Sequence, residues 1–491
     1  MHDLIVVGGG IHGVAVARDA SRRGLSVLLL ERGDIASGTS SRTSKLVHGG
    51  VRYLETAQFG LVREALRERA TLLRVAPAFV RPVPFLLPHF RGEGRSRAAV
   101  GFGLWLYTRL ARRDGLAARG ALSAAEAIAA VPGLSSDRLA GASRFWDAQM
   151  DDAPLCVALA VDAERAGAVL RTHTELTALA LLPGGRAWRA HFRDGIDGVE
   201  GEAEGRLIIN AAGPWSDAVR VLARGRPAPL VRHTRGTHVV APVRVSEQAL
   251  LLTARADGRV FFVLPWGAHS LIGTTDTDDE TDPSNVAPRP DDVRYLVEEA
   301  SRALPGALEG VRPVRAFAGV RSLARGRGRP WENTREHRVI AEPGMRTIVG
   351  GKYTTHRALA ERVVDGAVRS LAARARPCDT AVAPVPDGRA GAGARLAGDF
   401  PRRIEVDGGF QLAEADVARG VRLEKARRLD DVLLRRTRLW LDGRALRAAA
   451  MQCAAWMAPL LGWTDRRRSE EVNRLLAMLD REEAAIAEGT S

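Results

Sequence analysis

The sequence predicts an α/β fold, in which a Rossmann-like nucleotide-binding domain is interleaved with an antiparallel β-rich domain and a small C-terminal helical domain follows. Two observations carry this prediction. A strand, glycine turn and helix open the chain, and the same pattern returns at 207–219 and 345–368. Between these units lie short apolar segments typical of an antiparallel sheet. A simple dehydrogenase keeps its Rossmann halves closer together, so the wide spacing favours an inserted second domain.

The opening unit, LIVVGGGIHG at 4–13, carries a Gly-x-Gly-x-x-Gly turn between an apolar run and a helical stretch. Gly8 permits the tight turn, Gly10 lets the backbone approach a pyrophosphate, and Gly13 lets the helix pack close to the strand. Glu31 ends the next apolar run, where a carboxylate can accept a hydrogen bond from a ribose hydroxyl. The complete βαβ unit predicts a bound dinucleotide.

The other elements follow from periodicity and breakers. Helices are predicted over 61–77, 125–134 and 154–168, and a strand-like stretch over 169–181. The segments THVVAPV, VFFVLPW and SLIGTTD, at 237–243, 260–266 and 270–276, predict antiparallel strands. Residues 377–397 are rich in Pro, Gly and Ala and are expected to form a linker. Mainly helical sequence follows.

Composition limits the functions to consider. The chain has 491 residues, 46% hydrophobic and 26% charged, and a net charge of +14. The basic residues are scattered and almost all are Arg, so we expect no nucleic-acid binding but allow attraction to anionic lipid or to a phosphorylated substrate. Cys156, Cys378 and Cys453 are too far apart for a disulfide framework or a metal site. We expect no signal peptide, no membrane span and a cytoplasmic location.

The loop at 34–55, DIASGTSSRTSKLVHGGVRYLE, is the second informative segment. Its Gly, Ser and Thr residues allow the backbone to lie against a flat ring or a diphosphate. The loop also holds Lys45, His48, Arg52 and Tyr53. Because a solvated turn does not need so many donors, this loop is predicted to line the ligand site.

Several blocks together resemble the FAD-dependent (aerobic) glycerol-3-phosphate dehydrogenases. They are GGGIHG, TSSRTSKLVHGGVRYLE, MDDAPL, NAAGPW, IGTTD, FAGVRSL and GGKYTTHR, and they follow the order of that family over about residues 3–365. The resemblance implies bound FAD and oxidation of sn-glycerol 3-phosphate to dihydroxyacetone phosphate. It also implies FAD contacts from Gly8, Gly10, Gly13, Glu31, Thr39, Ser40, Ser41, Ser44, Lys45, His48, Gly49, Gly213, Trp215, Gly319, Gly351, Lys352 and Thr354.

The substrate phosphate needs cations. Arg52 and Arg321 are expected to bind it, because Arg can hold a phosphate with two hydrogen bonds. Lys352 is expected to act as a point charge near the flavin or the substrate oxygen. Tyr53 and Thr275 are expected at the substrate.

The catalytic base is left open between two histidines. Both His48 and His238 match histidines of the family pattern, and imidazole titrates in the right range for taking a hydroxyl proton. Either histidine could instead be a buried structural residue. Asp276 could orient one of them or cap a turn.

The electron acceptor is also open. A quinone-linked dehydrogenase is favoured, with an oxygen-using oxidase, a FAD oxidase of an amine or amino acid, and a non-catalytic flavin protein as alternatives. The apolar segment 99–113 is followed by arginines and is too short to span a bilayer. It is predicted either to dock on the inner face of the membrane or to lie in a core or dimer interface. A homodimer is left open.

The predicted domains are a core at 1–376, the linker at 377–397 and a helical domain at 398–491. The FAD-binding segments of the core are expected at about 1–80, 150–220 and 315–370, with the substrate domain interleaved.

Overall fold

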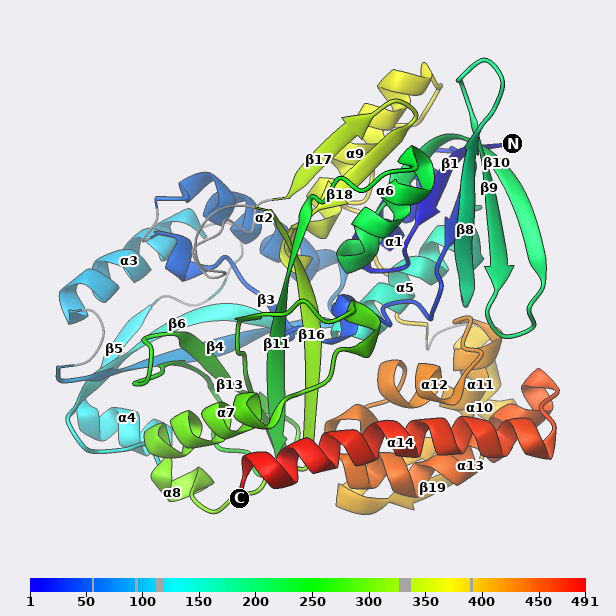
Figure 1. Ribbon diagram of the computed structural model, residues 1–491. Coiled ribbons are helices and arrows are strands. Elements are labelled where there is room, and N and C mark those ends of the chain that lie inside the picture. The colour runs from blue at the N-terminus through cyan, green and yellow to red at the C-terminus, as the bar shows by residue number, and fades with distance from the viewer. Residues whose placement is uncertain (55–56, 93–95, 112–115, 117–118, 326–336, 389–391) are drawn as a thin grey trace.

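A mostly parallel sheet and a mostly antiparallel sheet form the body of the protein, and a helical layer packs beneath both of them (Figure 1). The computed structural model describes residues 1–491 apart from 55–56, 93–95, 112–115, 117–118, 326–336 and 389–391. Within this part of the chain the predicted fold class is confirmed.

The first sheet runs in the order β17-β18-β10-β1-β2-β7, and β8 and β9 extend it from β10. Its strands are β1 (His2–Val7), β2 (Val27–Leu30), β7 (Val169–Arg171), β8 (Thr174–Leu181), β9 (Trp188–Asp194), β10 (Glu200–Asn210), β17 (Arg338–Glu342) and β18 (Met345–Val349). The strands β7, β2, β1, β10 and β18 are parallel. Helices cover one face and the β8–β9 hairpin covers part of the other, which is why β1 and β2 are almost continuously apolar (Figure 1).

The glycine turn after β1 is held by close backbone approach. Gly8 has φ of +109°, and a Cβ there would lie 2.6 Å from the carbonyl oxygen of Ala211 in the turn after β10. A Cβ at Gly13 would overlap the carbonyl oxygen of Gly8. These contacts draw the start of α1 (Ile11–Arg22) onto the ends of two parallel strands.

The second sheet runs in the order β15-β11-β14-β13-β12-β4-β6-β3, with β16 on β11 and β5 on β6. Its strands are β3 (Leu46–Val47), β4 (Val80–Phe90), β5 (Gly120–Leu122), β6 (Leu139–Met150), β11 (Val231–Ala241), β12 (Ala249–Thr253), β13 (Val260–Trp266), β14 (His269–Gly273), β15 (Thr277–Asp278) and β16 (Arg315–Ala324). Apart from the parallel pair β4–β12, its pairs are antiparallel. The three predicted segments correspond to β11, β13 and β14.

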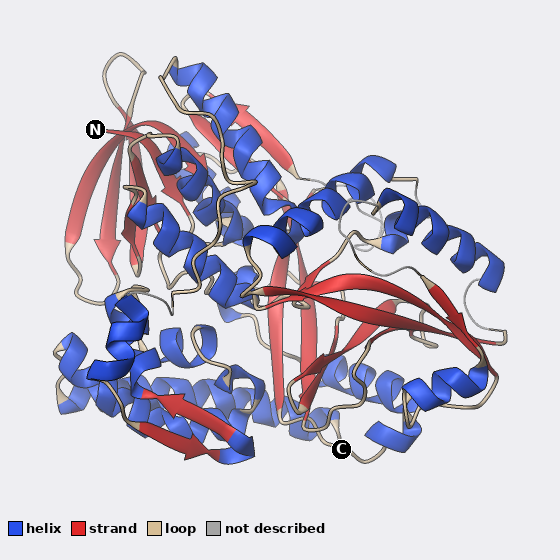
Figure 2. Ribbon diagram, turned by 180° about the vertical axis from the view of Figure 1, so that it is seen from behind, coloured by secondary structure: helices blue, strands red, loops and turns tan. Residues whose placement is uncertain are grey.

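The remaining helices flank these sheets and build the C-terminal layer (Figure 2). In the core they are α2 (Phe59–Val75), α3 (Arg97–Leu110), α4 (Ala124–Ala130), α5 (Asp152–Arg165), α6 (Ser216–Arg224), α7 (Pro290–Ala303), α8 (Pro305–Leu308) and α9 (His356–Leu371). The C-terminal helices are α10 (Ala392–Asp399), α11 (Glu414–Arg422), α12 (Leu429–Arg435), α13 (Gly443–Leu461) and α14 (Asp465–Gly489), with the hairpin β19 (Arg403–Val406) and β20 (Phe410–Ala413). No helix among the described residues is long and apolar enough to cross a bilayer.

The expected linker packs against the core where it is described. Asp379 pairs with Arg22 at 2.6 Å, and the Val385 amide donates to the carbonyl oxygen of Val75. Helix α10 begins within the expected linker range. The exact domain limits stay a prediction.

Candidate functional site

A cavity of about 2320 Å³ lies between the two sheets, outside the carboxyl ends of β1 and β10. It is lined by the glycine turns of the first sheet, by much of the loop at 37–54, and by β11, β13 and β16 of the second sheet. Ordinary small-molecule pockets occupy roughly 300–1,000 Å³. The cavity therefore has room for a dinucleotide and a second, smaller ligand, at the position where open α/β sheets bind ligands.

One end of the cavity suits the diphosphate and ribose of a nucleotide. Gly8 and Gly10 line it, and Gly10 is the N-cap residue of α1 and offers no side-chain cap, so the positive end of the helix is available to an anion. The Glu31 carboxylate accepts hydrogen bonds from the Gly9 and Gly33 amides at 2.6 Å and 2.7 Å. Burial raises the pKa of Glu31, and the two amides oppose that shift. Glu31 is thus a fixed acceptor facing the cavity.

The turn after β10 closes the same end. Gly213 and Trp215, in the short 3-10 helix η3 (Gly213–Trp215), line the cavity. The guanidinium carbon of Arg32 lies 4.2 Å from the centre of the Trp215 ring. The Ser40 hydroxyl accepts from the amide of Ile11, so the loop is tied to the first turn of α1.

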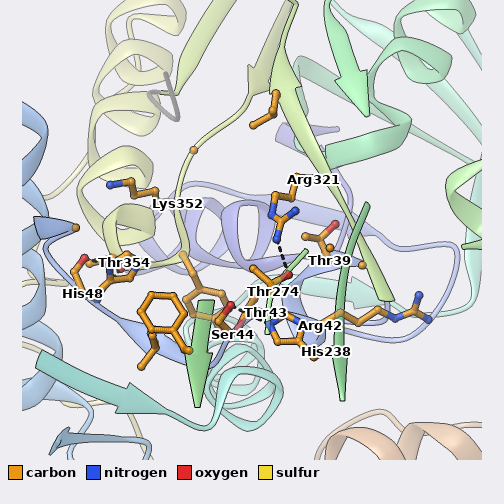
Figure 3. A pocket seen from close by; sticks show the side chains of 18 of the residues that line it. Thr39, Arg42, Thr43, Ser44, His48, His238, Thr274, Arg321, Lys352 and Thr354 are labelled. Atoms are coloured by element: carbon orange, nitrogen blue, oxygen red, sulfur yellow. Dashed lines mark hydrogen bonds between the residues drawn. The ribbon is translucent and has the colours of Figure 1, made fainter. Parts of the chain in front are cut away.

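The other end gathers the ionisable side chains (Figure 3). His48, Lys352 and Thr354 lie on one side of the cavity, and Arg321, Thr274 and His238 lie on the other. The His48 amide donates to the Thr354 hydroxyl at 3.3 Å. The ammonium nitrogen of Lys352 lies 3.6 Å from the centre of the Tyr53 ring, which also lines the cavity.

His238 is buried on β11 and stacks on Phe317, with ring centroids 5.1 Å apart. Its Nε2 lies 2.9 Å from the Ser44 hydroxyl oxygen, and its Nδ1 has no hydrogen-bond partner among the described residues. Burial lowers the pKa of His238 well below its usual value, and the positive charges of Arg321 and Lys45 lower it further. The lowered pKa favours the neutral form of the His238 imidazole.

Arg321 is held in place by two neighbours. Its Nη1 donates to Asp276 at 3.0 Å and its Nη2 donates to the Thr274 hydroxyl at 2.8 Å, the bond drawn in Figure 3. It lies across Gly236, where any side chain would overlap the guanidinium. Asp276 therefore pairs with Arg321, a contact that the sequence did not suggest.

Most of the residues expected to bind cofactor line this cavity, but some lie elsewhere. Lys45 is buried 2.6 Å from Asp152 and stacks on Trp440, so its ammonium is used within the protein. Thr275 accepts from the Thr237 amide behind the cavity, and its neighbour Thr274 faces the cavity instead. The lining residues do not include Gly13, whose place is under the turn, nor Ser41 and Gly49. The side chain of Arg52 lies outside the described part of the structure.

Arg42 and Thr43 are among the lining residues that the sequence analysis did not name. Arg42 donates to the carbonyl oxygen of Ala318 at 3.1 Å, and burial lowers the pKa of Arg42. Both residues lie within the loop that was singled out for its donors. The sequence does not show which side chains of this loop point into the cavity.

The donor set fits FAD. The start of α1 suits the diphosphate and the fixed Glu31 suits the ribose, while His48, His238 and Lys352 line the end where a flavin ring would lie. Residues 3–361 match the family model described as FAD dependent oxidoreductase. The protein is thus an FAD-dependent oxidoreductase, and its cofactor is FAD. Residues 394–468 match the C-terminal domain of alpha-glycerophosphate oxidase.

Similar proteins narrow the family. The chain is 36% identical to a glycerol-3-phosphate dehydrogenase of Mycobacterium leprae over 97% of its own length and 87% of that protein. The chain belongs to the FAD-dependent glycerol-3-phosphate dehydrogenase family. Its fold resembles a glycerol-3-phosphate dehydrogenase from Bacillus halodurans complexed with FAD, with a TM-score of 0.77, 24% identity and coverage of 98% and 95%. It also resembles L-alpha-glycerophosphate oxidase from Mycoplasma pneumoniae, with a TM-score of 0.59, 18% identity and coverage of 78% and 99%.

Proposed function

We propose that this protein oxidises sn-glycerol 3-phosphate to dihydroxyacetone phosphate and passes the electrons to a quinone. The observation that carries the proposal is the meeting of Arg321, Lys352, His48 and His238 at one end of the nucleotide cavity. The similarity to proteins named glycerol-3-phosphate dehydrogenase, over nearly the whole chain, supports it.

The histidines supply the base. Oxidation of a secondary alcohol removes a hydride from carbon and a proton from the hydroxyl group, and bound FAD supplies the hydride acceptor. A neutral imidazole can take the proton, and the lowered pKa keeps His238 neutral. His48 lines the same cavity and is the second candidate. Lys352, 9% exposed, can stabilise negative charge that develops near the reacting oxygen.

The cations select the phosphate. Arg321 presents its guanidinium to the cavity in a geometry set by Thr274 and Asp276. Because Asp276 neutralises part of its charge, we expect a second cation to help hold a dianionic phosphate. The sequence analysis predicts that Arg52 has that role, and Lys352 lines the same cavity.

The proposal that a quinone accepts the electrons rests on the apolar residues of the cavity and on α3. Apolar side chains from β4, α3, β12 and β13 also line the cavity; they include Phe85, Leu87, Val100, Leu104, Leu106, Leu251 and Phe262. On the outside of α3, Phe102 is 65% exposed and stacks on Trp105, with Arg109 over the Trp105 ring. These apolar lining residues and the exposed aromatics of α3 suit a lipid-soluble acceptor and peripheral contact with the inner face of the membrane.

The alternative is an oxidase that returns electrons to oxygen and makes peroxide, since the same residues would serve it. An amine or amino-acid oxidase is weaker, because a carboxylate needs one cation and this site offers Arg321 and Lys352. A non-catalytic flavin protein would not need the ionisable set. A homodimer stays open.

The experiment is a product and acceptor assay. The purified protein is incubated with sn-glycerol 3-phosphate and a soluble quinone analogue under argon, and dihydroxyacetone phosphate is quantified. A parallel sample in air without quinone is assayed for peroxide. Product formed with quinone and little peroxide supports the dehydrogenase. Rapid peroxide formation would instead identify the protein as an oxidase, and absence of product under both conditions would reject the proposed reaction.

A further inference from the structure

The loop from Asp34 to Lys45 provides much of the cofactor wall, and both of its ends contact the C-terminal helical domain. Between these ends Thr39, Ser40, Arg42, Thr43 and Ser44 line the cavity. In contrast, no described residue after Thr354 lines it. The C-terminal domain therefore touches the loop from behind, without facing the ligand.

The first contact is a buried cluster of charges. The Asp34 carboxylate, 1% exposed, meets the Nε of Arg435 at 2.5 Å and two guanidinium nitrogens of Arg436 at 2.6 Å and 2.8 Å. Asp431 balances the second positive charge, since it accepts from Arg435 at 2.6 Å. Asp431 also lies 2.8 Å from the Nε2 of His173.

This cluster is also linked by hydrogen bonds to the segment that carries Glu31, the acceptor expected for the ribose. The His173 amide donates to the carbonyl oxygen of Gly33, and the Thr174 amide donates to that of Glu31. Glu31 and Asp34 are three residues apart, so the same short segment carries the fixed acceptor and the buried anchor. Charge-assisted hydrogen bonds in a dry environment are directional, and they leave this segment little freedom.

The second contact lies at the other end of the loop. The ammonium nitrogen of Lys45 is 4.3 Å from the centre of the Trp440 ring and 2.6 Å from the Asp152 carboxylate. Trp440 comes from the C-terminal domain and accepts from Arg315 through its carbonyl oxygen. Asp152 contacts the loop a second time, since its carboxylate also accepts a hydrogen bond from the Thr43 hydroxyl at 2.7 Å.

We propose that Arg435, Arg436 and Trp440 are positioning residues for FAD, and that the C-terminal domain sets the affinity for the cofactor by holding both ends of the 34–45 loop. None of the three touches the cavity, so their effect on FAD passes through the loop. The proposal concerns cofactor affinity and does not depend on which substrate or acceptor the enzyme uses.

The test uses the full-length protein stripped of FAD and titrated with FAD by flavin fluorescence. Arg436→Met removes one guanidinium while Arg435 still pairs with Asp34. The matched control is Arg447→Met, which removes an arginine paired with Asp480 and Glu483 on the outer surface of the same domain. We expect Arg436→Met to weaken FAD binding at least about tenfold, or about 1.4 kcal/mol, and the control to stay within about twofold of wild type.

Two further measurements separate positioning from general stability. Hydrogen exchange of the apo-protein should rise over 34–45 in Arg436→Met and not in the control. A lower Tm with unchanged FAD affinity in the folded fraction would overturn the proposal. If Arg436→Met does not fold, Trp440→Leu tests the other end of the loop, because Lys45 still pairs with Asp152 in that variant. About threefold weaker FAD binding is expected for Trp440→Leu. Unchanged FAD affinity in this variant overturns the proposal.

Discussion

The Nε2 atom of His238 on β11 lies 2.9 Å from the hydroxyl oxygen of Ser44, in the loop that follows the nucleotide-binding turn. This bond joins the antiparallel sheet to the cofactor wall at the reactive end of the cavity. It occupies one ring nitrogen and leaves Nδ1 as the atom without a partner among the described residues. Because the Ser44 hydroxyl lines the cavity, the bond places the His238 ring beside the cofactor wall.

The first prediction concerns the base. His238→Asn should lower kcat by about 10²–10⁴ if this imidazole takes the hydroxyl proton, with little change in KM. The lowered pKa of His238 places the acidic limb of its kcat/KM profile below pH 6.5, where activity falls as the imidazole becomes protonated. His48→Asn is measured in parallel, and His191→Asn on β9, outside the cavity lining, is the control. If only His48→Asn shows the loss, the base is His48.

The second prediction concerns Arg321. Replacing it with Ala removes a charge-assisted contact to the phosphate and should cost roughly 2–4 kcal/mol of transition-state binding, or about 10²–10³ in kcat/KM. The flavin spectrum should not change. Arg232→Ala is a suitable control, because Arg232 lies on β11 and pairs with Asp278 away from the cavity lining. Wild-type kcat/KM in Arg321→Ala would remove this residue from phosphate recognition.

The third prediction concerns stability in acid. Burial lowers the pKa of His356 from 6.5 to about 3 and that of His12 to about 4. Below pH 6.5 the unfolded chain therefore binds protons that the folded chain does not, so stability falls as the pH drops from 6.5 toward the folded values. The slope should reach up to about 1.4 kcal/mol per pH unit for each such histidine.

Urea unfolding as a function of pH measures this slope. His356→Gln should flatten this slope, and His191→Gln, at a half-buried site on β9, should leave the slope as in wild type. A slope that is the same in wild type and in His356→Gln would show that this histidine does not control the acid limb.

The fourth prediction concerns α3. If Phe102 and Trp105 insert at a membrane surface, Phe102→Glu with Trp105→Glu should abolish co-sedimentation with anionic liposomes, since each charge opposes burial at the acyl boundary. Met451→Glu is the matched control, because Met451 is an exposed apolar residue on α13. Equal sedimentation of wild type and the double variant, or none for wild type, would exclude α3 as the contact.

The sequence predicted those parts of the fold that depend on local pattern. The three strand and glycine-turn units lie where expected, because each needs only an apolar strand, a glycine at a close backbone approach and a helix start. The antiparallel strands were equally visible as short apolar runs with turn residues between them.

The predictions that were wrong depend on contacts between segments that are distant in the sequence. Lys45 looked like a ligand for the cofactor, but Asp152 and Trp440, far along the chain, use its charge inside the protein. Thr274 and Thr275 are adjacent and chemically identical, so only the backbone direction decides which one faces the cavity. The pairing of Asp34 with Arg435 and Arg436 spans about 400 residues, and no local pattern indicates it.

The most direct test of the central claim is anaerobic reduction of the bound flavin by single substrates. The protein is mixed in a stopped-flow instrument with sn-glycerol 3-phosphate, glycerol or an amino acid, and the loss of the oxidised flavin spectrum is followed. The account predicts rapid bleaching by sn-glycerol 3-phosphate and reduction slower by at least about 10² with glycerol, because Arg321 and Lys352 then have no phosphate to bind. Equal rates with glycerol, or bleaching by the amino acid alone, would contradict it.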